Sequence, residues 1–315
     1  MRQFVVNSAF GHIVVNSTFG YAKRNLSTMR ASFKCDRSVS IPMDFPTYER
    51  AIKHEKLMES LQNFVLALSM KPNSIRIQYL SDVHVDSNDK IPMIKPVSDI
   101  LAICGDIGKP THPNFDAFLK HVSKQFEQIY FVPGNHDYDC GPFYDTEKVE
   151  YYEKILTNIC NRYSNITLLN NSFSVIGDNT IIAGTTLWCN PVLRTNVVYD
   201  YEKHEEHLRR HYRDVQWITN LCKAQKNTNI VMLSHFVPTF KLIEQKYMSR
   251  GIHKTSAFAT DLEYLIKDPI VAWLCGHTHS VTHTCINGVF CGVNAHGYKH
   301  EASNNFPSKY IDVEI

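Results

Sequence analysis

The chain has 315 residues, of which 43% are hydrophobic and 20% are charged, proportions typical of a globular protein. Its formal net charge of +2 and its pI near 8.0 argue against the strong attraction that draws basic proteins to nucleic acid or acidic membranes. The sequence contains no apolar stretch near the roughly 18 residues of a membrane-spanning helix, so we expect no membrane association. The nine cysteines show no paired framework, which favours a reducing, cytoplasmic setting.

Residues 1–35 contain five basic residues and no Asp or Glu, and they are rich in Ser, Thr and Asn. This composition is that of a mitochondrial transit peptide, and an ordinary extension is the alternative that we favour. Residues 5–11 are echoed by residues 14–20, which predicts either a hairpin of two strands or a local duplication. Apolar residues at helical spacing between Tyr48 and Met70 predict an amphipathic helix. We assign residues 1–73 to an N-terminal extension.

The main domain is predicted to span residues 74–315, where strands and helices alternate. A helix over residues 115–126 separates two of the first strands, and such alternation favours a largely parallel sheet covered by helices. Short apolar runs predict strands at 75–80, 100–104, 129–132, 166–169, 180–183, 230–233, 271–275, 289–293 and 310–313. The later part is rich in strands, which favours an α/β fold with two stacked mixed sheets over one doubly wound sheet.

Five short polar motifs each follow a predicted strand. They are Asp82-Val83-His84, Gly105-Asp106, Gly134-Asn135-His136-Asp137, Ser234-His235 and Gly276-His277-Thr278-His279. Their carboxylate, amide and imidazole groups suit Mn, Fe, Zn, Co or Mg. Loops at the carboxyl ends of strands are where open α/β sheets present such groups. The motifs therefore predict one centre in which two cations, about 3.5–4 Å apart, share a carboxylate.

As an ordered set, these motifs resemble the signature of the calcineurin-like metallophosphoesterase superfamily, over residues from about 74 to 315. The resemblance implies a two-sheet sandwich flanked by helices, with a dinuclear metal site at the strand ends that hydrolyses phosphoesters. It implies that one metal is held by Asp82, His84 and His279, the other by Asn135, His235 and His277, and both by Asp106. It also implies that His136 protonates the leaving group. Asp137 is expected either to orient the His136 ring or to act as a surface or capping carboxylate.

The sequence departs from one branch of that superfamily. Serine/threonine protein phosphatases usually carry Gly-Asp-x-x-Asp-Arg, whereas Lys109 and Pro110 stand at the last two positions here. Dephosphorylation of phosphoproteins is therefore in doubt. Residues 184–188 and 294–298 also resemble stretches of a poorly characterised microbial subgroup with no settled substrate. Asn190, His296 and Tyr298 are candidate substrate contacts, and packing at the strand ends is the alternative for each.

The gap of 100 residues between Asn135 and His235 suggests a helical cap insertion around residues 138–228. Within it, the charged stretch 200–226 predicts a long helix or a helix pair. His207 and His211 have the spacing of a metal pair, but the alternating charges around them favour a solvated helix face. If the helix overhangs the site, these histidines would instead contact the substrate phosphate.

These features lead us to expect a hydrolase of a small phosphomonoester or phosphodiester that uses two divalent metal ions, with Mn favoured. A nuclease or nucleotide phosphodiesterase is the first alternative, although the chain lacks the basic, aromatic-bearing footprint of nucleic-acid binding. A non-catalytic scaffold is the second, although every ligand position is filled by a competent residue. The sequence leaves the oligomeric state open, and a mitochondrial location is the alternative if residues 1–35 are a transit peptide.

Overall fold

The computed structural model describes residues 2–8, 11–17, 74–88, 91–141, 144–193, 201–301 and 306–314. The chain divides into two compact units, Met1–Lys56 and Leu57–Ile315. In the first unit, β1 (Arg2–Ser8) and β2 (Gly11–Ser17) pair antiparallel, so the two echoed segments form a hairpin. The helix expected between Tyr48 and Met70 lies outside the described residues. Among those residues, no helix has both the length and the apolar character needed to cross a membrane.

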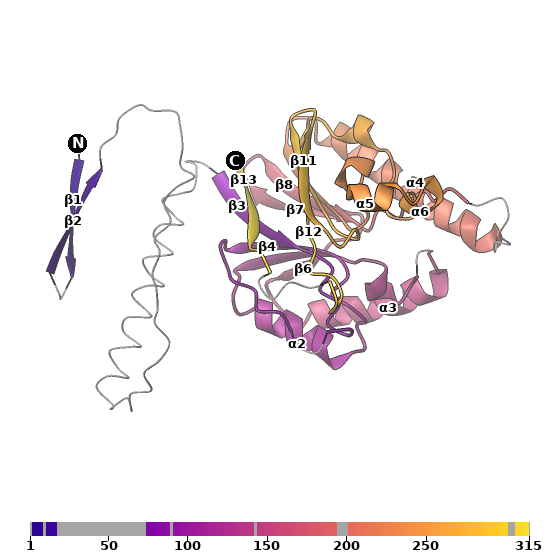
Figure 1. Cartoon of the computed structure of the whole chain (residues 1–315), viewed down its shortest axis with the longest axis horizontal. Helices are drawn as coiled ribbons and strands as arrows, with labels where there is room; N and C mark the ends of the chain where they lie inside the picture. The colour runs from indigo at the N-terminus through magenta and orange to yellow at the C-terminus, as the bar shows by residue number, and fades with distance from the viewer. Residues whose placement is uncertain are drawn as a thin grey trace. The chain divides into compact units, whose positions relative to one another are not determined.

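The first sheet of the second unit has five strands in the order β13-β3-β4-β5-β6. Four of them are parallel neighbours: β3 (Ser74–Leu80), β4 (Ile100–Cys104), β5 (Gln128–Val132) and β6 (Ile166–Leu168). The last strand, β13 (Lys309–Glu314), pairs antiparallel with β3. Helices α2 (Pro113–Val122) and α3 (Thr146–Cys160) cover the outer face of this sheet (Figure 1).

The second sheet has six strands in the order β11-β12-β10-β9-β8-β7. Its four central strands are parallel: β8 (Thr180–Thr185), β9 (Asn229–Ser234), β10 (Ile270–Cys275) and β12 (Val289–Asn294). The two edge strands, β7 (Ser172–Gly177) and β11 (Val281–Ile286), run antiparallel to their neighbours. The outer face carries α4 (Tyr201–Ala224), the short α5 (Gln245–Met248) and α6 (Ile252–Thr255), and the turns η2 (Phe240–Leu242) and η3 (Glu263–Leu265) (Figure 1).

Apolar side chains fill the space between the two sheets and beneath the helices on either side. The layer between the sheets includes Ile77 and Val132 from one sheet and Val231 and Leu274 from the other, all fully buried. Because the central parallel strands are covered on both faces, they read as continuous apolar runs in the sequence. The stripe of α2 that faces its sheet consists of Phe115, Phe118, Leu119 and Val122. The expected pair of stacked mixed sheets flanked by helices is therefore confirmed.

The structure corrects the expected cap insertion at residues 138–228. Within this range, β6 joins the first sheet, and β7 and β8 join the second. Most of the described range therefore belongs to the sandwich itself, with α3 and α4 as its covering helices.

The expected solvated face of α4 is also wrong for two of its histidines. The side chains of His207 and His211 are only 0% and 3% exposed. The His207 ring accepts a hydrogen bond from the Tyr144 amide at 2.9 Å and donates one to the Cys189 carbonyl at 2.8 Å. The His211 ring donates to the Trp188 carbonyl at 2.5 Å. Buried polar groups require partners of this kind, so these histidines fasten α4 to the loop that follows β8.

Candidate metal centre

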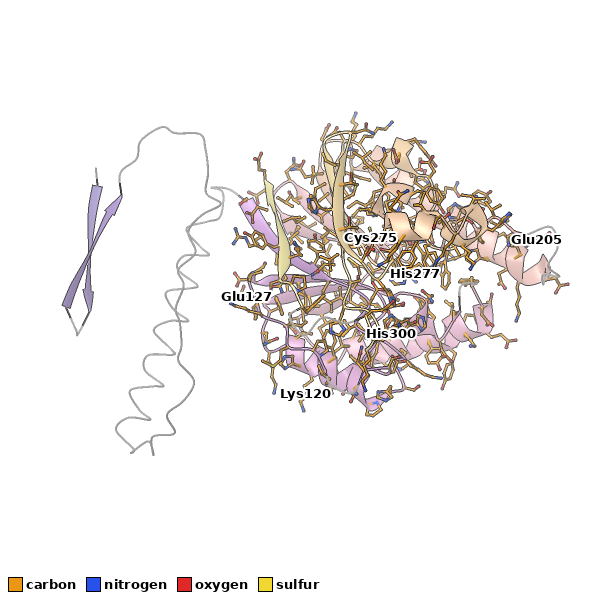
Figure 2. The ribbon with its side chains drawn as sticks, in the orientation of Figure 1. Lys120, Glu127, Glu205, Cys275, His277 and His300 are labelled. Atoms are coloured by element: carbon orange, nitrogen blue, oxygen red, sulfur yellow. The ribbon has the colours of Figure 1, made fainter. Side chains whose placement is uncertain are left out.

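The polar motifs meet where strands of the two sheets end side by side. Asp82 follows β3, Asp106 follows β4, and His235 and His277 follow β9 and β10 in the other sheet. A bridge between Ser81 and Ala295 joins the two sheets at this edge. Figure 2 labels His277 just beyond Cys275, the last residue of β10, in the middle of the second unit. The parallel topology thus brings side chains that are far apart in sequence to one place.

Five side chains of the motifs sit on left-handed backbone. The φ angles lie between 46° and 66° at Asp82, His84, Asp106, His277 and His279. For residues other than glycine, this conformation is strained, and such strain persists where the surrounding structure enforces it, often at functional sites.

Two glycines make room for the same loops. A Cβ atom on Gly134 would collide with the Asp106 carboxylate, and one on Gly105 would collide with the His235 ring. Gly105 also has a φ of 86°, which glycine adopts without strain. The loops therefore approach each other more closely than residues with side chains would allow.

Asp82, His84 and His279 form the first group of possible metal ligands. The Nε2 atoms of His84 and His279 lie 3.0 Å apart, and Asp82 Oδ1 lies 3.5 Å from His279 Nε2. Asp82 and His84 are completely buried, whereas the His279 side chain is 14% exposed. Two imidazole nitrogens and a carboxylate oxygen therefore converge on one point.

Asp106, His235 and His277 form a second such group, beside Asn135. His235 Nε2 lies 3.1 Å from His277 Nδ1, 3.1 Å from Asn135 Oδ1 and 3.3 Å from Asp106 Oδ2. The rings of Phe236 and Phe258 pack against His277, with centroids 4.1 and 5.0 Å away. A third group, which comprises His84, Asp106 and His136, links the other two.

Asp106 stands between the two main groups. Its Oδ2 atom lies 3.3 Å from His235 Nε2 and 3.9 Å from His84 Nε2, one in each group. Its Oδ1 atom accepts a hydrogen bond from the His136 amide at 2.8 Å. The Oδ2 atom is buried and has no well-aligned hydrogen-bond donor among the described residues. Because a buried carboxylate oxygen without a donor is costly, this position fits a metal ligand.

Three histidines each contact an oxygen acceptor through the ring nitrogen that points away from the ligand groups. The other ring nitrogen of each points toward them. His235 Nδ1 donates to the Cys104 carbonyl at 2.9 Å, and His277 Nε2 donates to the Ala257 carbonyl at 3.3 Å. His279 Nδ1 lies 2.6 Å from Glu301 Oε2. Each outer nitrogen faces an oxygen acceptor, so the inner nitrogen is the one available to a metal once it carries no proton. This arrangement is typical of histidines that bind metal.

Glu301 is the residue of the site that the sequence did not single out. It lies beyond the last motif, and its carboxylate also accepts a hydrogen bond from the Tyr298 amide at 3.1 Å. The only sequence signal was its position a few residues after the 294–298 stretch.

The Asp137 carboxylate holds the loops together. Its Oδ2 atom accepts hydrogen bonds from the amides of Asp106 and Gly134, both at 2.7 Å, and its Oδ1 atom accepts one from Gly108 at 3.1 Å. Asp137 is fully buried, so it is not a surface carboxylate, and its contacts are those of a carboxylate that caps backbone amides. Burial and the nearby Asp106 raise the pKa of Asp137, while the amides of Gly134 and Gly108 oppose that change.

Burial and mutual contact determine the charges of the ligand groups. Burial raises the pKa of Asp106, but the imidazoles around it, His235 above all, outweigh burial and place the pKa well below its usual value. Burial lowers the pKa of His84 to about 3. Burial also lowers the pKa of His235, but the Asp106 carboxylate outweighs it and raises this pKa to about 9. The centre therefore combines an ionised carboxylate with imidazoles of differing basicity.

His136 lies at the edge of the groups and is half-buried. Its ring stands edge-on to His84 with centroids 4.9 Å apart, and its Nε2 atom lies 3.1 Å from the Tyr298 hydroxyl.

Of the three candidate substrate contacts, the structure therefore brings Tyr298 into the site. The backbone N–H of Asn190 donates to the Thr260 hydroxyl at 2.9 Å, and the ring of His296 packs against Phe306. The role of these two residues as substrate contacts stays a prediction.

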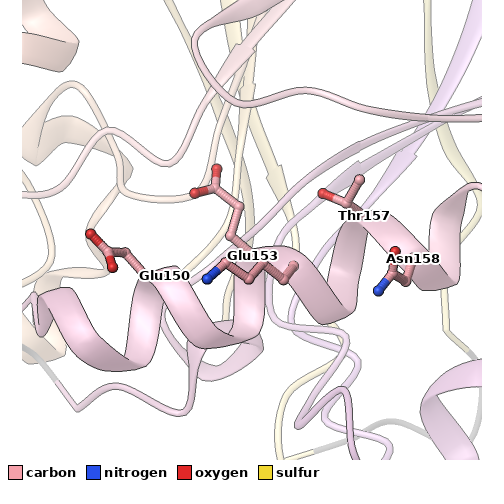
Figure 3. Close-up of a pocket in the computed structure, with 5 residues that line it drawn as sticks. Glu150, Glu153, Thr157 and Asn158 are labelled. Carbon is pink, nitrogen blue, oxygen red and sulfur yellow. The ribbon is translucent and has the colours of Figure 1, made fainter.

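The structure also has a surface hollow away from the motifs. A cavity of about 460 Å³ lies along α3 and is lined by Glu150, Glu153, Lys154, Thr157 and Asn158 (Figure 3). None of the histidines or aspartates described above is among the residues that line it.

Comparisons with known proteins agree with the fold described above. The family model for the calcineurin-like phosphoesterases matches residues 75–281. An uncharacterized protein of Acanthamoeba polyphaga mimivirus is 28% identical, over 76% of this chain and 96% of its own length. The crystal structure of phosphopantetheinyl hydrolase from Mycobacterium tuberculosis has the same fold, with a TM-score of 0.57 and 17% identity, over 77% of this chain and 97% of that one. With its strand-end ligand groups and this family match, the chain belongs to the calcineurin-like phosphoesterase family.

Proposed function

We propose that this protein hydrolyses a small phosphomonoester or phosphodiester with the help of two divalent cations. Asp82, His84 and His279 would hold one cation, Asn135, His235 and His277 the other, and Asp106 both. One observation carries the proposal. His235, His277 and His279 each turn one ring nitrogen toward buried carboxylates, while the other nitrogen faces an oxygen acceptor. Mixed oxygen and imidazole ligands favour Mn, with Fe, Zn, Co and Mg as alternatives.

Such cations, when bound, would lower the pKa of a water molecule and offset the charge on the phosphoryl oxygens. Proton transfer to the leaving group and alignment of the site depend on side chains of the protein. His136 lies beside Asp106 at the partly exposed edge of the centre, where its imidazole can give a proton to the departing oxygen. Asp137 keeps the loops of Asp106 and Gly134 in a fixed relation, so that the ligands and the acid stay aligned.

A small substrate is favoured over a phosphoprotein because of what surrounds Lys109. Lys109 and Pro110 stand where protein phosphatases carry Asp and the phosphate-gripping Arg. The Lys109 ammonium is 3.0 Å from the Asp139 carboxylate and is paired there. The near-neutral charge of the whole chain likewise favours a small molecule over a nucleic acid.

The test is a substrate panel with added Mn²⁺. Monoesters, diesters, cyclic nucleotides, dinucleotides and oligonucleotides are compared, together with a phosphopantetheinyl ester because of the M. tuberculosis neighbour. The proposal predicts hydrolysis of at least one small ester, lost on chelation and lost in Asp106→Asn. The matched control is Asp116→Asn, which removes an exposed carboxylate that pairs with Arg162 at 3.0 Å on α2. Cleavage of oligonucleotides alone would favour the nuclease alternative, and no hydrolysis by metal-loaded protein would contradict the proposal.

A further inference from the structure

The hydroxyl of Tyr298 contacts the proposed acid, His136. Its oxygen lies 3.1 Å from His136 Nε2. We infer that Tyr298 is a positioning residue, which holds the His136 imidazole in place for proton transfer to the leaving group. This inference rests on the proposed function and extends it to a residue outside the metal ligands.

The Tyr298 ring packs against two histidines of the first ligand group. It stacks on His84 with centroids 4.2 Å apart and an angle of 29° between the ring planes. It also meets the edge of His279 at 4.7 Å. The imidazoles of His84, His279 and His300 therefore pack against the phenol ring, and the contact with His136 is the one made by its hydroxyl.

The loop that carries Tyr298 is fastened to the first ligand motif. The Gly297 amide donates to the Asp82 carbonyl at 2.9 Å, and the His296 amide donates to the Ser81 carbonyl at 3.0 Å. Glu301 accepts a hydrogen bond from the Tyr298 amide while it contacts His279 Nδ1. The position of the hydroxyl is therefore tied to the ligand groups by the backbone on one side and by a carboxylate on the other.

A tyrosine hydroxyl suits both states of the acid. When His136 is protonated, its Nε2–H donates to the hydroxyl oxygen; when Nε2 has lost its proton, the hydroxyl donates to the nitrogen. Because the hydroxyl engages Nε2, the proton that passes to the leaving oxygen comes from Nδ1 of the imidazolium, as the bond between phosphorus and that oxygen breaks. The imidazole is then neutral, and Nε2 keeps its hydrogen bond to the Tyr298 hydroxyl. The same contact thus orients the ring before and after transfer.

Tyr298→Phe separates the packing of the ring from the hydrogen bond of the hydroxyl, because it keeps the aromatic ring and removes the hydroxyl. The matched control is Tyr163→Phe, which removes a hydroxyl bound to Asp116 at 2.7 Å, away from the ligand groups. Both variants and the wild type are assayed with a p-nitrophenyl ester, whose leaving group needs little protonation, and with an alkyl ester, whose leaving group needs much. Metal content is measured on every sample.

Whole general acids contribute about 10²–10⁴-fold, so loss of a positioning contact is expected to slow the alkyl ester about tenfold. The p-nitrophenyl ester should change less than about twofold by the same reasoning, because it bypasses the acid. The metal content of Tyr298→Phe should equal that of the wild type. Equal slowing of both esters, or no slowing of either, would overturn the inference.

A second measurement does not depend on turnover. In metal-free protein, the ring ¹⁵N resonances of His136 report the partner of Nε2 directly. We expect them to shift in Tyr298→Phe and to stay in place in Tyr163→Phe; unchanged resonances in Tyr298→Phe would refute the contact. If the wild type cleaved neither ester, the proposed function would fail, while these resonances would still decide whether Tyr298 positions His136.

Discussion

The Nε2 atoms of His84 and His279 face each other at 3.0 Å across the first ligand group. Glu301 contacts the other nitrogen of His279 at 2.6 Å, which places the proton there and leaves Nε2 bare. The Nδ1 atom of His84 is buried and has no hydrogen-bond partner among the described residues. A cation bound by both facing Nε2 atoms and by the Asp82 carboxylate would account for their close approach.

The first prediction concerns the bridging carboxylate. Asp106→Asn removes one charge from the point between the two groups, so neither cation is held with full affinity. We expect metal content per chain to fall by at least half, measured by elemental analysis after dialysis against a fixed free-metal concentration. Asp116→Asn serves as the control and should keep the metal content of the wild type. Full metal content in Asp106→Asn would show that Asp106 is not a shared ligand.

The second prediction separates the acid from the ligands. His136→Ala should retain its metals but turn over esters with poor leaving groups about 10²–10⁴-fold more slowly. Esters with good leaving groups should be affected much less. Steady-state rates on a series of esters with graded leaving-group basicity provide the measurement. If alkyl esters were cleaved at the rate of the wild type, His136 would not be the acid.

The third prediction concerns Glu301, whose carboxylate supports His279. Removal of such a partner typically weakens metal affinity or activity 10–100-fold, and we expect a loss in that range for Glu301→Ala. Glu301→Gln retains an oxygen acceptor and should lose less. Glu263→Gln is a control, because Glu263 pairs with Lys241 at 2.6 Å on the surface. Affinities from competition with a metal-sensitive dye would decide, and equal affinity in Glu301→Ala and the wild type would count against this role.

The fourth prediction concerns stability at acid pH. Burial lowers the pKa of His207 to about 4, from 6.5 for an ordinary histidine. Between these two values, the unfolded chain binds a proton that the folded protein does not, so stability falls as pH drops from about 6.5 to 4. The group contributes up to about 3 kcal/mol to this fall.

His207→Gln should therefore make the free energy of unfolding less dependent on pH in this window. Urea unfolding at pH 7 and pH 5 measures the effect, with His253→Gln on α6 as an exposed control. A pH dependence as steep as that of the wild type would mean that His207 is not the group responsible.

The sequence allowed prediction of features that depend on local pattern. The central strands are apolar on both faces and stand out as short runs that end at polar motifs. The edge strands β7 and β11 alternate exposed and covered side chains, so neither was predicted. His207 and His211 looked solvated because their neighbours on α4 are charged, and only the position of the Trp188–Cys189 loop shows that both are buried.

Contacts between distant segments could not be predicted in the same way. Glu301 is 22 residues from His279 in sequence, and nothing in its immediate surroundings marks it as a partner of that ring. For the Asp137 carboxylate the sequence left open whether it orients the His136 ring or caps backbone, and it binds backbone amides of two loops. Motifs identify which chemical groups are available, whereas the fold decides which of them meet.

The most direct test of the proposed dinuclear hydrolysis is a titration of metal-free protein with Mn²⁺, in which bound metal and hydrolysis of a responsive ester are followed together. We predict that hydrolysis is absent at the start and reaches its maximum when two ions are bound per chain. Full hydrolysis without added metal, or two bound ions with no hydrolysis of any ester in the panel, would contradict the account.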